Sequence, residues 1–417
     1  MQIEYITSNN MWKLLYETIR LMDKATAHHG MRVSYIMSKM LECRGLNEKF
    51  EIADFMMLAM LHDVGAFKTD DVKKPLTYEA KAPAPHSVYG YLFLKYLSPL
   101  SDMSKMILYH HIDYSRTKDI DYQYKDELEI LKVAEIIDVW IRAFGDKFSI
   151  NMLDRYAGTK YQEEACQLLK QADAEFEIVK KIMDRSYIKE VDEAMEYILL
   201  SDDEKEKYLK MLMYCTGLKS ENMVSETVAT MYVCRELGRK LKQSEMDKNE
   251  VYYAALLHDI GMLAMPSKLV DAPRSLNQAE KNFIHTHVEI MEKVLEGKIS
   301  PDIISIASAH HERCDGSGYP RGLKGNAMSD KQAILQIAEN VVHMGMEKPY
   351  RRAFTKDEII KDLNDGIVND KYDGIIADTM VRNYDEIMEK AFAREQNALV
   401  THQKLQSNYE QVYKSFR

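Results

Sequence analysis

The sequence predicts an all-α protein, and three observations carry this prediction. Its 417 residues include only 17 glycines and 9 prolines, roughly half of the usual share, which disfavours a turn-rich β protein. Its 27 methionines suit adaptable helical cores. In FEIADFMMLAMLHD the apolar residues follow helical spacing; they are Ile52, Phe55, Met56, Ala59 and Met60. We therefore expect long helices joined by short connections.

The two halves of the chain repeat each other, which predicts the domain organisation. A length of 417 residues allows two or three domains. LAMLHDVGAF at 58–67 returns as AALLHDIGML at 254–263, and ILKVAEIIDVW at 130–140 returns as ILQIAENVVHM at 334–344. Such repeats indicate two homologous helical domains. The expected boundaries are 1–165 for the first domain, 166–215 for a helical connector, 216–395 for the second domain and 396–417 for a charged, amphipathic C-terminal helix.

Each domain is expected to present its helices in the same order. In the first domain, a helix that carries AHHGMRVSYI precedes a buried helix that ends at His62 and Asp63. Gly65, just beyond, can cap that helix. Gly261 holds the same place after VYYAALLHD in the second domain. Strand signals are nearly absent, except for short stretches near Asp315–Pro320.

Charge and composition exclude several classes of function. The chain has a net charge of −10, whereas binding to a phosphate backbone needs a basic surface. We therefore expect no DNA or RNA polymer as a partner. No run of about 18 apolar residues exists, so we expect no membrane span. The N-terminus has no basic stretch followed by an apolar one, which argues against a signal peptide. Five cysteines, odd in number and without a CxxC pair, favour a cytoplasmic protein with reduced thiols.

Histidines recur at corresponding places in the two halves: His62, His86, His110 and His111 in the first, and His258, His287, His310 and His311 in the second. A lone histidine on an apolar helix is more often a core residue, but an ordered series that occurs twice indicates metal ligands. Mixed nitrogen and oxygen ligands suit Fe, Mn, Co or Zn. Adjacent histidines on a helix point about 100° apart and would serve different ions. We therefore expect a two-metal centre, the usual apparatus for phosphoester hydrolysis.

One long motif adds a family resemblance. HHERCDGSGYPRGLKG at 310–325 matches the HHE-x-x-D-G-x-G-Y-P-x-G-L-x-G pattern of HD-GYP domains. The second half, over roughly 220–385, therefore resembles the HD-GYP branch of the HD superfamily of metal-dependent phosphohydrolases. The first half resembles an HD domain more loosely, over about 25–170. The resemblance implies two tandem helical HD-type domains, with two divalent transition metals, Fe or Mn, in each intact site. It also implies hydrolysis of a cyclic dinucleotide, cyclic di-GMP or cyclic GMP–AMP, by attack of a metal-bound hydroxide.

The resemblance also implies residues for the second domain. The metal ligands would be His258, Asp259, His287, His310 and His311, with Glu339 where the family has an aspartate. The substrate side would include Asp315, Gly316, Gly318, Tyr319 and Pro320, joined by Lys348 and Arg351 in a basic stretch. The alternative for that stretch is a solvated basic cluster. Asp259 would also take a catalytic role.

The first domain keeps the ligands but not the loop. Its expected set is His29, His62, Asp63, His86, His110 and His111, completed by Glu135 or Asp138, with Asp63 also catalytic. Counted through the repeat, the place of His29 falls on Ser225 in the second domain, and Glu221, one turn earlier, could contribute a carboxylate instead. The family's HDIGK lysine is Met262 here, and a missing cation beside the phosphate is worth about 3 kcal/mol or more.

Three hypotheses follow from this pattern. The first is an active metal-dependent phosphodiesterase for a cyclic dinucleotide. The second is a partly degenerate HD-GYP domain that binds a cyclic dinucleotide as a receptor without cutting it. The third is an N-terminal HD domain that hydrolyses another nucleotide phosphoester. A homodimer or a signalling-protein partner is left open in each case.

Overall fold

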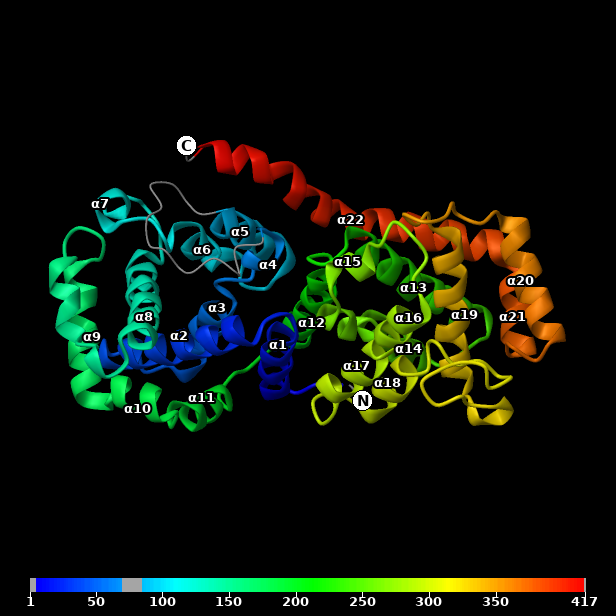
Figure 1. The fold of residues 1–417 in the computed structure, drawn as a ribbon, viewed down its shortest axis with the longest axis horizontal. Coiled ribbons are helices and arrows are strands. Elements are labelled where there is room, and N and C mark those ends of the chain that lie inside the picture. Colours follow the sequence, from blue (N-terminus) through cyan, green and yellow to red (C-terminus); the bar gives the residue numbers. More distant parts are fainter. Residues whose placement is uncertain (1–4, 70–84, 416–417) are drawn as a thin grey trace. The chain divides into compact units, whose positions relative to one another are not determined.

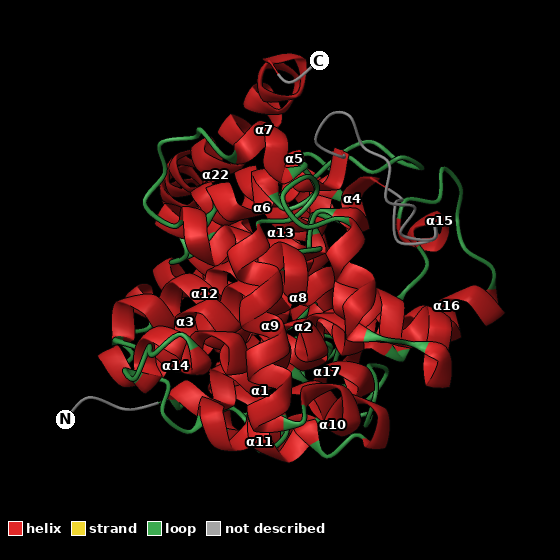
Figure 2. Ribbon diagram, turned by 90° about the vertical axis from the view of Figure 1, so that its left-hand side faces the viewer, coloured by secondary structure: helices red, strands yellow, loops and turns green. Residues whose placement is uncertain are grey.

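The computed structural model describes residues 5–69 and 85–415, apart from the side chains of Glu221 and Asn326. Helices make up most of this part of the chain (Figure 2). Extended pairing among the described residues is confined to isolated bridges, one of them between Asp315 and Lys324. The predicted all-α class is confirmed. None of the described helices combines the length and the hydropathy that a membrane span requires.

The chain divides into two compact units. We call Ser8–Tyr208 with His402–Arg417 the N-terminal unit, and Leu209–Thr401 with Met1–Thr7 the C-terminal unit. The helices expected to form a connector after residue 165 thus fall in the N-terminal unit as far as Tyr208. Helices α12 (Asp202–Thr216) and α22 (Tyr384–Ser415) contribute residues to both units.

The N-terminal unit is built from a run of helices (Figure 1). They are α1 (Ser8–Met22), α2 (Lys24–Cys43), α3 (Lys49–Leu61), α4 (Ala66–Thr69), α5 (Pro85–Leu97), α6 (Lys105–Tyr109), α7 (Tyr114–Thr117), α8 (Lys125–Phe144), α9 (Glu163–Phe176), α10 (Ile178–Asp184) and α11 (Tyr187–Met195), with 3-10 turns η2 (Ser101–Met103), η3 (Gly145–Lys147) and η4 (Ile150–Arg155). Helix α2 begins where Asp23 accepts a hydrogen bond from the backbone N–H of Thr26. It packs against both α3 and α8.

The C-terminal unit follows the same plan. Its helices are α13 (Glu221–Lys240), α14 (Glu245–Leu257), α15 (Ser267–Val270), α16 (Gln278–His285), α17 (His287–Leu295), α18 (Pro301–Ala307), α19 (Asp330–Gly345), α20 (Lys356–Val368) and α21 (Gly374–Arg382), with η5 (Ile260–Ala264) and η6 (Gly325–Ala327). Helix α13 packs on α14 and α19 as α2 packs on α3 and α8. Capping boxes open α16, α19 and α20.

The glycine after each His-Asp pair has a different role from the expected one. Neither Gly65 nor Gly261 adopts the left-handed conformation of a helix cap, so the capping prediction is wrong. Instead, a Cβ on Gly65 would lie 2.1 Å from the carbonyl oxygen of His86. A Cβ on Gly261 would lie 2.0 Å from the carbonyl oxygen of His287. Both glycines therefore let the His-Asp turn approach the helix that carries the next histidine.

Candidate metal centres

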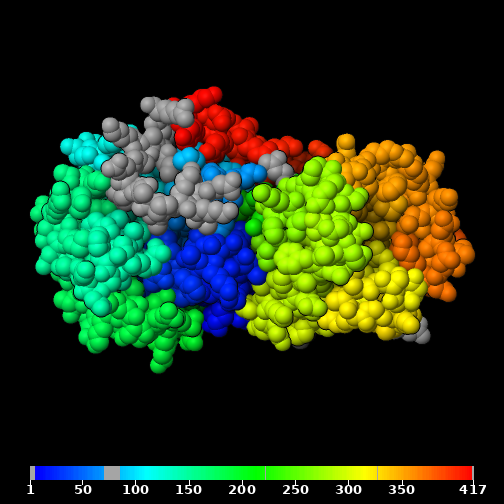
Figure 3. Space-filling view, in the orientation of Figure 1, coloured from blue at the N-terminus to red at the C-terminus, as the bar shows by residue number. Residues whose placement is uncertain are grey.

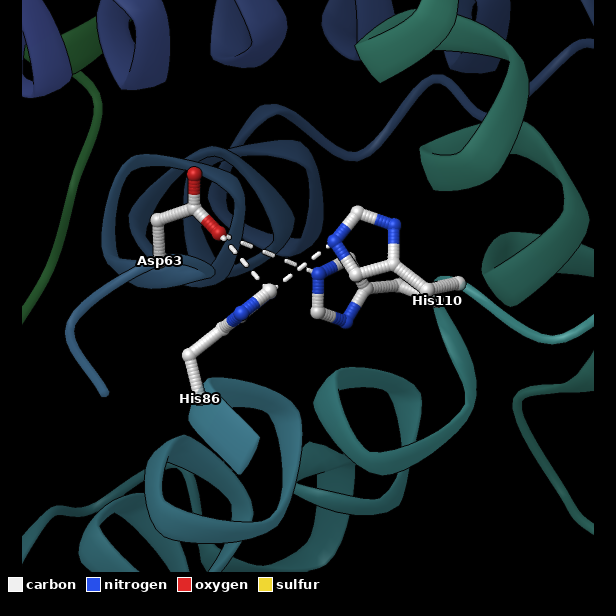
Figure 4. Close-up of side chains that lie close together, drawn as sticks. Asp63, His86 and His110 are labelled. Atoms are coloured by element: carbon white, nitrogen blue, oxygen red, sulfur yellow. Dashed lines mark hydrogen bonds and ion pairs between the residues drawn. The ribbon is translucent and has the colours of Figure 1, made fainter. Parts of the chain in front are cut away.

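Five elements of the N-terminal unit bring polar side chains to one point: α2, α3, α5, α6 and α8. His62 and Asp63 follow α3, His86 lies in the first turn of α5, and His110 follows α6. Asp63 lies between the histidines: its Oδ1 is 3.6 Å from Nε2 of His86 and 3.9 Å from Nε2 of His110 (Figure 4). Its Oδ2 is 3.5 Å from Nε2 of His62 and 3.9 Å from Nε2 of His29. One carboxylate thus faces two pairs of histidines.

The side chains form two groups that could each hold an ion. One is Asp63, His86, His110 and His111; the other is His29, His62 and Glu135. In each group the ligand atoms lie within 4.8 Å of one another. His110 and His111 fall in the same group, and the expectation that adjacent histidines serve different ions stays a prediction. Both residues lie in the turn beyond α6 rather than inside a helix, so the angular separation of helical neighbours does not apply.

Unpaired buried atoms indicate that these groups suit a cation. Among the described residues, Nε2 of His29, His62 and His110 has no hydrogen-bond partner, and the same holds for Oδ1 of Asp63 and Oε2 of Glu135. Buried polar atoms are nearly always paired, so five unpaired acceptors around one point are a strong exception. The residues therefore fit a divalent metal with mixed nitrogen and oxygen ligands.

The tautomers support the same conclusion. Nδ1 of His62 lies 2.6 Å from the carbonyl oxygen of Ala59, and Nδ1 of His110 lies 2.6 Å from that of Ile107. A carbonyl oxygen can only accept, so each Nδ1 carries the proton and donates it. Each Nε2 is left with its lone pair toward Asp63. An outer N–H held by backbone is the usual arrangement of a metal-ligating histidine.

Glu135 lies inside this centre, whereas Asp138 lies outside it. Glu135 joins the inner group, with its Oε1 3.5 Å from Nδ1 of His111. Asp138 lies behind His29, whose Nδ1 is 2.6 Å from Oδ2 of Asp138. Arg32 and Arg142 also bond Asp138, the latter at 3.0 Å. Burial would raise the pKa of Asp138, but the bonds from His29 and Arg32 hold that pKa well below its usual range.

The C-terminal unit repeats the inner arrangement around Asp259. Its Oδ1 is 3.4 Å from Nε2 of His287 and 3.9 Å from Nε2 of His310, and its Oδ2 is 3.4 Å from Nε2 of His258. His287, His310 and His311 form a group that could hold an ion. Burial would lower the pKa of His258, but the carboxylate of Asp259 raises it to about 9.

This second centre is less complete than the first. Glu339 approaches His311 only to 4.0 Å. Helix α13 contains no histidine, and α19 has Val342 where α8 has Asp138. Ser225 is half-buried on α13, and the side chain of Glu221 lies outside what the structure describes. Among the described side chains of this unit, the outer support of the N-terminal centre therefore has no equivalent.

The loop after His311 is fastened by a residue that the sequence analysis did not single out. Glu312 is fully buried and accepts hydrogen bonds from the backbone N–H groups of Arg321, at 2.6 Å, and Leu323, at 2.9 Å. A Cβ on Gly318 would lie 2.5 Å from the backbone of Glu312, so the loop passes too close for any side chain there. In the sequence, the only signal for Glu312 was its position as the glutamate of the HHE motif.

The predicted substrate residues take different positions on this loop. The ring centroid of Tyr319 lies 3.7 Å from that of His285, on which it stacks, and 4.6 Å from that of His311, one of the predicted metal ligands. Pro320 follows Tyr319 through a cis peptide bond. Asp315 is largely exposed, and its Oδ1 accepts a bond from the backbone N–H of Ser317. Gly316 adopts φ 80°, a conformation that side chains rarely allow.

The two predicted phosphate contacts already have partners. Lys348 forms an ion pair with the half-buried carboxylate of Glu226 and is 12% exposed. The guanidinium of Arg351 donates to the carbonyl oxygens of His343, Met344 and Met346, at 2.6, 3.3 and 3.2 Å. This geometry indicates a structural role for Arg351 at the end of α19. Phosphate binding by either residue stays a prediction.

Comparison with known proteins gives matches in both halves. Two family models, each described as an HD domain, match residues 26–142 and 210–376. The chain is 23% identical over 390 residues to 3'3'-cGAMP-specific phosphodiesterase 1 of Vibrio cholerae, covering 88% of this chain and 89% of that protein. It is 27% identical over 173 residues to a cyclic di-GMP phosphodiesterase of Thermotoga maritima, covering 41% and 47% of the two chains.

A solved structure resembles the chain in fold. It is a crystal structure of a cyclic GMP–AMP-specific phosphodiesterase of Vibrio cholerae, V-cGAP3, with a TM-score of 0.56 and 17% sequence identity. The match covers 91% of this chain and 98% of that one. The shared fold therefore extends over both units.

Proposed function

This chain belongs to the HD-domain family, with one HD domain in each half, and from that premise we propose that it is a metal-dependent phosphodiesterase that hydrolyses a cyclic dinucleotide. The observation that carries the proposal is the set of buried, unpaired acceptors around Asp63. The similarity to cyclic GMP–AMP and cyclic di-GMP phosphodiesterases supports the substrate class. Which of these two dinucleotides is cleaved is left to the assay below.

The metal ligands are proposed as two sets joined by one carboxylate. In the N-terminal unit, Asp63 would be shared between an ion held by His29, His62 and Glu135 and an ion held by His86, His110 and His111. Fe or Mn suits this mixture of donors. Bound ions would supply a nucleophile from water near neutral pH and would neutralise charge on the phosphate. Asp259 would hold the corresponding place in the C-terminal unit.

The protein's own groups have defined tasks in this proposal. Backbone carbonyls fix the outer nitrogens of the histidines, so the inner nitrogens keep a constant direction. In the C-terminal unit, the ring of Tyr319 beside His311 would offer a wall for a nucleobase or ribose. Glu312 holds the loop that presents this ring.

A receptor role for the C-terminal unit is the second candidate. It is favoured by the absence of histidine from α13 and by Met262 at the place of a lysine beside the phosphate. In that case the N-terminal unit, with its fuller ligand set, would carry out the hydrolysis. The substrate of the N-terminal unit could then be another nucleotide phosphoester, because this unit lacks a loop like the one that carries Tyr319.

A single series of assays separates these candidates. The full chain, prepared without air and supplied with Fe²⁺ or Mn²⁺, is incubated with cyclic di-GMP and with cyclic GMP–AMP. His62→Ala and His258→Ala each disable one centre, and the double variant sets the background. Loss of turnover in only one variant identifies the active unit. Binding without turnover in the wild-type chain would favour the receptor role. The absence of both binding and turnover would refute the proposal.

The remaining proposals concern partners and location. We propose a cytoplasmic location because all five cysteines are free thiols, two of them only half-buried. A homodimer or a signalling partner stays a prediction, to be tested by the mass of the protein in solution.

A further inference from the structure

A small cavity lies in the N-terminal unit, where the turn between α10 and α11 approaches α2 and α8. Its volume is about 270 Å³, and its polar lining consists of His28, Arg32, Arg142, Arg185 and Tyr187. The rest of the wall is apolar, made of three isoleucines and Met183. We call it the arginine pocket. No carboxylate and none of the proposed metal ligands lines it, so it is separate from the centre around Asp63.

The charges in the arginine pocket are not balanced. Arg32 and Arg142 share a single carboxylate, that of Asp138. Arg185 forms no ion pair with the residues that the structure describes. Three guanidinium groups therefore meet one opposing charge.

The backbone presents Arg185 in an unusual way. It joins α10 to α11 with φ 67°, a left-handed conformation that is uncommon for a residue with a side chain. Such conformations tend to occur where surrounding structure or function requires them. The turn lies at the surface of the unit (Figure 3), and Met183 and Ile188 are 46% and 39% exposed. A ligand can therefore reach the pocket from solvent.

We infer that the arginine pocket binds a phosphate group, either inorganic phosphate or the terminal phosphate of a mononucleotide. Guanidinium groups match phosphate oxygens with paired hydrogen bonds, and three of them converge here. The cavity is smaller than the roughly 300–1,000 Å³ of most small-molecule sites, so it does not enclose a whole cyclic dinucleotide. Its apolar wall suits the sugar of a mononucleotide. This site is additional to the proposed catalytic centres.

Direct binding to the full chain tests the inference. Inorganic phosphate and GMP are titrated separately by calorimetry at constant ionic strength, with the protein first treated with a chelator so that no metal can bind the phosphate. We expect saturable binding, weakened about tenfold or more by Arg185→Gln. Arg155→Gln, an exposed arginine of the same unit outside the pocket, should bind as the wild type does. Equal affinity for the two probes would assign the site to free phosphate, and tighter binding of GMP to a nucleotide.

Two outcomes would overturn the inference. One is the absence of saturable binding to the chelated wild-type chain, and the other is unchanged affinity in Arg185→Gln. Circular dichroism of each variant shows whether the fold is kept, and Arg142→Gln gives a second, independent test. Because the titration needs neither metal nor turnover, its failure is distinguishable from failure of the proposed phosphodiesterase activity.

Discussion

Replacing Asp138 by asparagine should weaken metal binding in the N-terminal unit and spare the C-terminal unit. Asp138 is fully buried and accepts the outer N–H of His29 at 2.6 Å, together with bonds from Arg32 and Arg142. Asparagine has nearly the same shape but carries no charge and turns an N–H₂ group toward one of these donors. His29 then loses the charge-assisted bond that holds its ring in place.

The expected size of the effect follows from that bond. A hydrogen bond to a charged group contributes about 1.5–3 kcal/mol. Loss of a residue that orients a metal ligand typically costs 10–100-fold in metal affinity, which is about 1.4–2.7 kcal/mol. The two ranges agree. Because Arg32 is only 14% exposed, its lost partner should also lower the stability of the metal-free chain, by roughly 1–3 kcal/mol.

The measurement is competition for Mn²⁺ between the full chain and a chelator of known affinity. The wild-type chain should show sites of at least two affinities, and Asp138→Asn should weaken only one class. Asp126→Asn, an exposed residue in the first turn of the same helix, serves as the control. Unchanged affinity in all classes would refute the orienting role of Asp138. Equal weakening of every class would indicate general damage to the fold instead.

Three further predictions rest on other parts of the chain. Gly65→Ala should lower stability by more than about 2 kcal/mol, because its Cβ would meet a carbonyl oxygen at 2.1 Å, whereas Gly374→Ala, with only ordinary contacts, should melt near the wild type. Glu312→Gln should speed hydrogen exchange of the two loop amides that donate to Glu312, by about tenfold or more. Unchanged exchange would show that Glu312 does not hold the loop in place. Burial raises the pKa of Glu395 to about 7, so the wild type should lose stability as the pH rises toward and through 7, whereas Glu395→Gln should not. If the melting temperatures of the wild type and the variant change equally between pH 5 and pH 8, this prediction is wrong.

The sequence was sufficient for the fold class and for the grouping of histidines around each aspartate of the His-Asp pairs. Helical spacing and scarce glycine predict helices directly, because both act through local backbone preferences. The repeated His-Asp pair marks Asp63 and Asp259, and the structure places histidines around each. The repeat was informative because two copies of one fold bring corresponding positions together in the same way.

Side-chain partners could not be predicted in the same way. Gly65 looked like a helix cap because a cap is the local reason for glycine, whereas its actual neighbour is a carbonyl oxygen more than twenty residues away. Lys348 looked like a free cation because its partner, Glu226, is far away in the sequence, on α13. The arginine pocket combines residues of four helices, α2, α8, α10 and α11, so no sequence motif indicates it.

Glu135 and Asp138 show most clearly what the fold adds. They are three residues apart on α8 and share a face, so spacing alone leaves open which one belongs with the metal. The structure favours Glu135, because Arg32, Arg142 and Nδ1 of His29 already occupy the carboxylate of Asp138. The C-terminal unit supports this division of roles: it lacks a histidine on α13, and it also has Val342 in place of Asp138. If the aspartate served mainly to hold that histidine, losing one removes the need for the other, since a buried carboxylate without partners is costly.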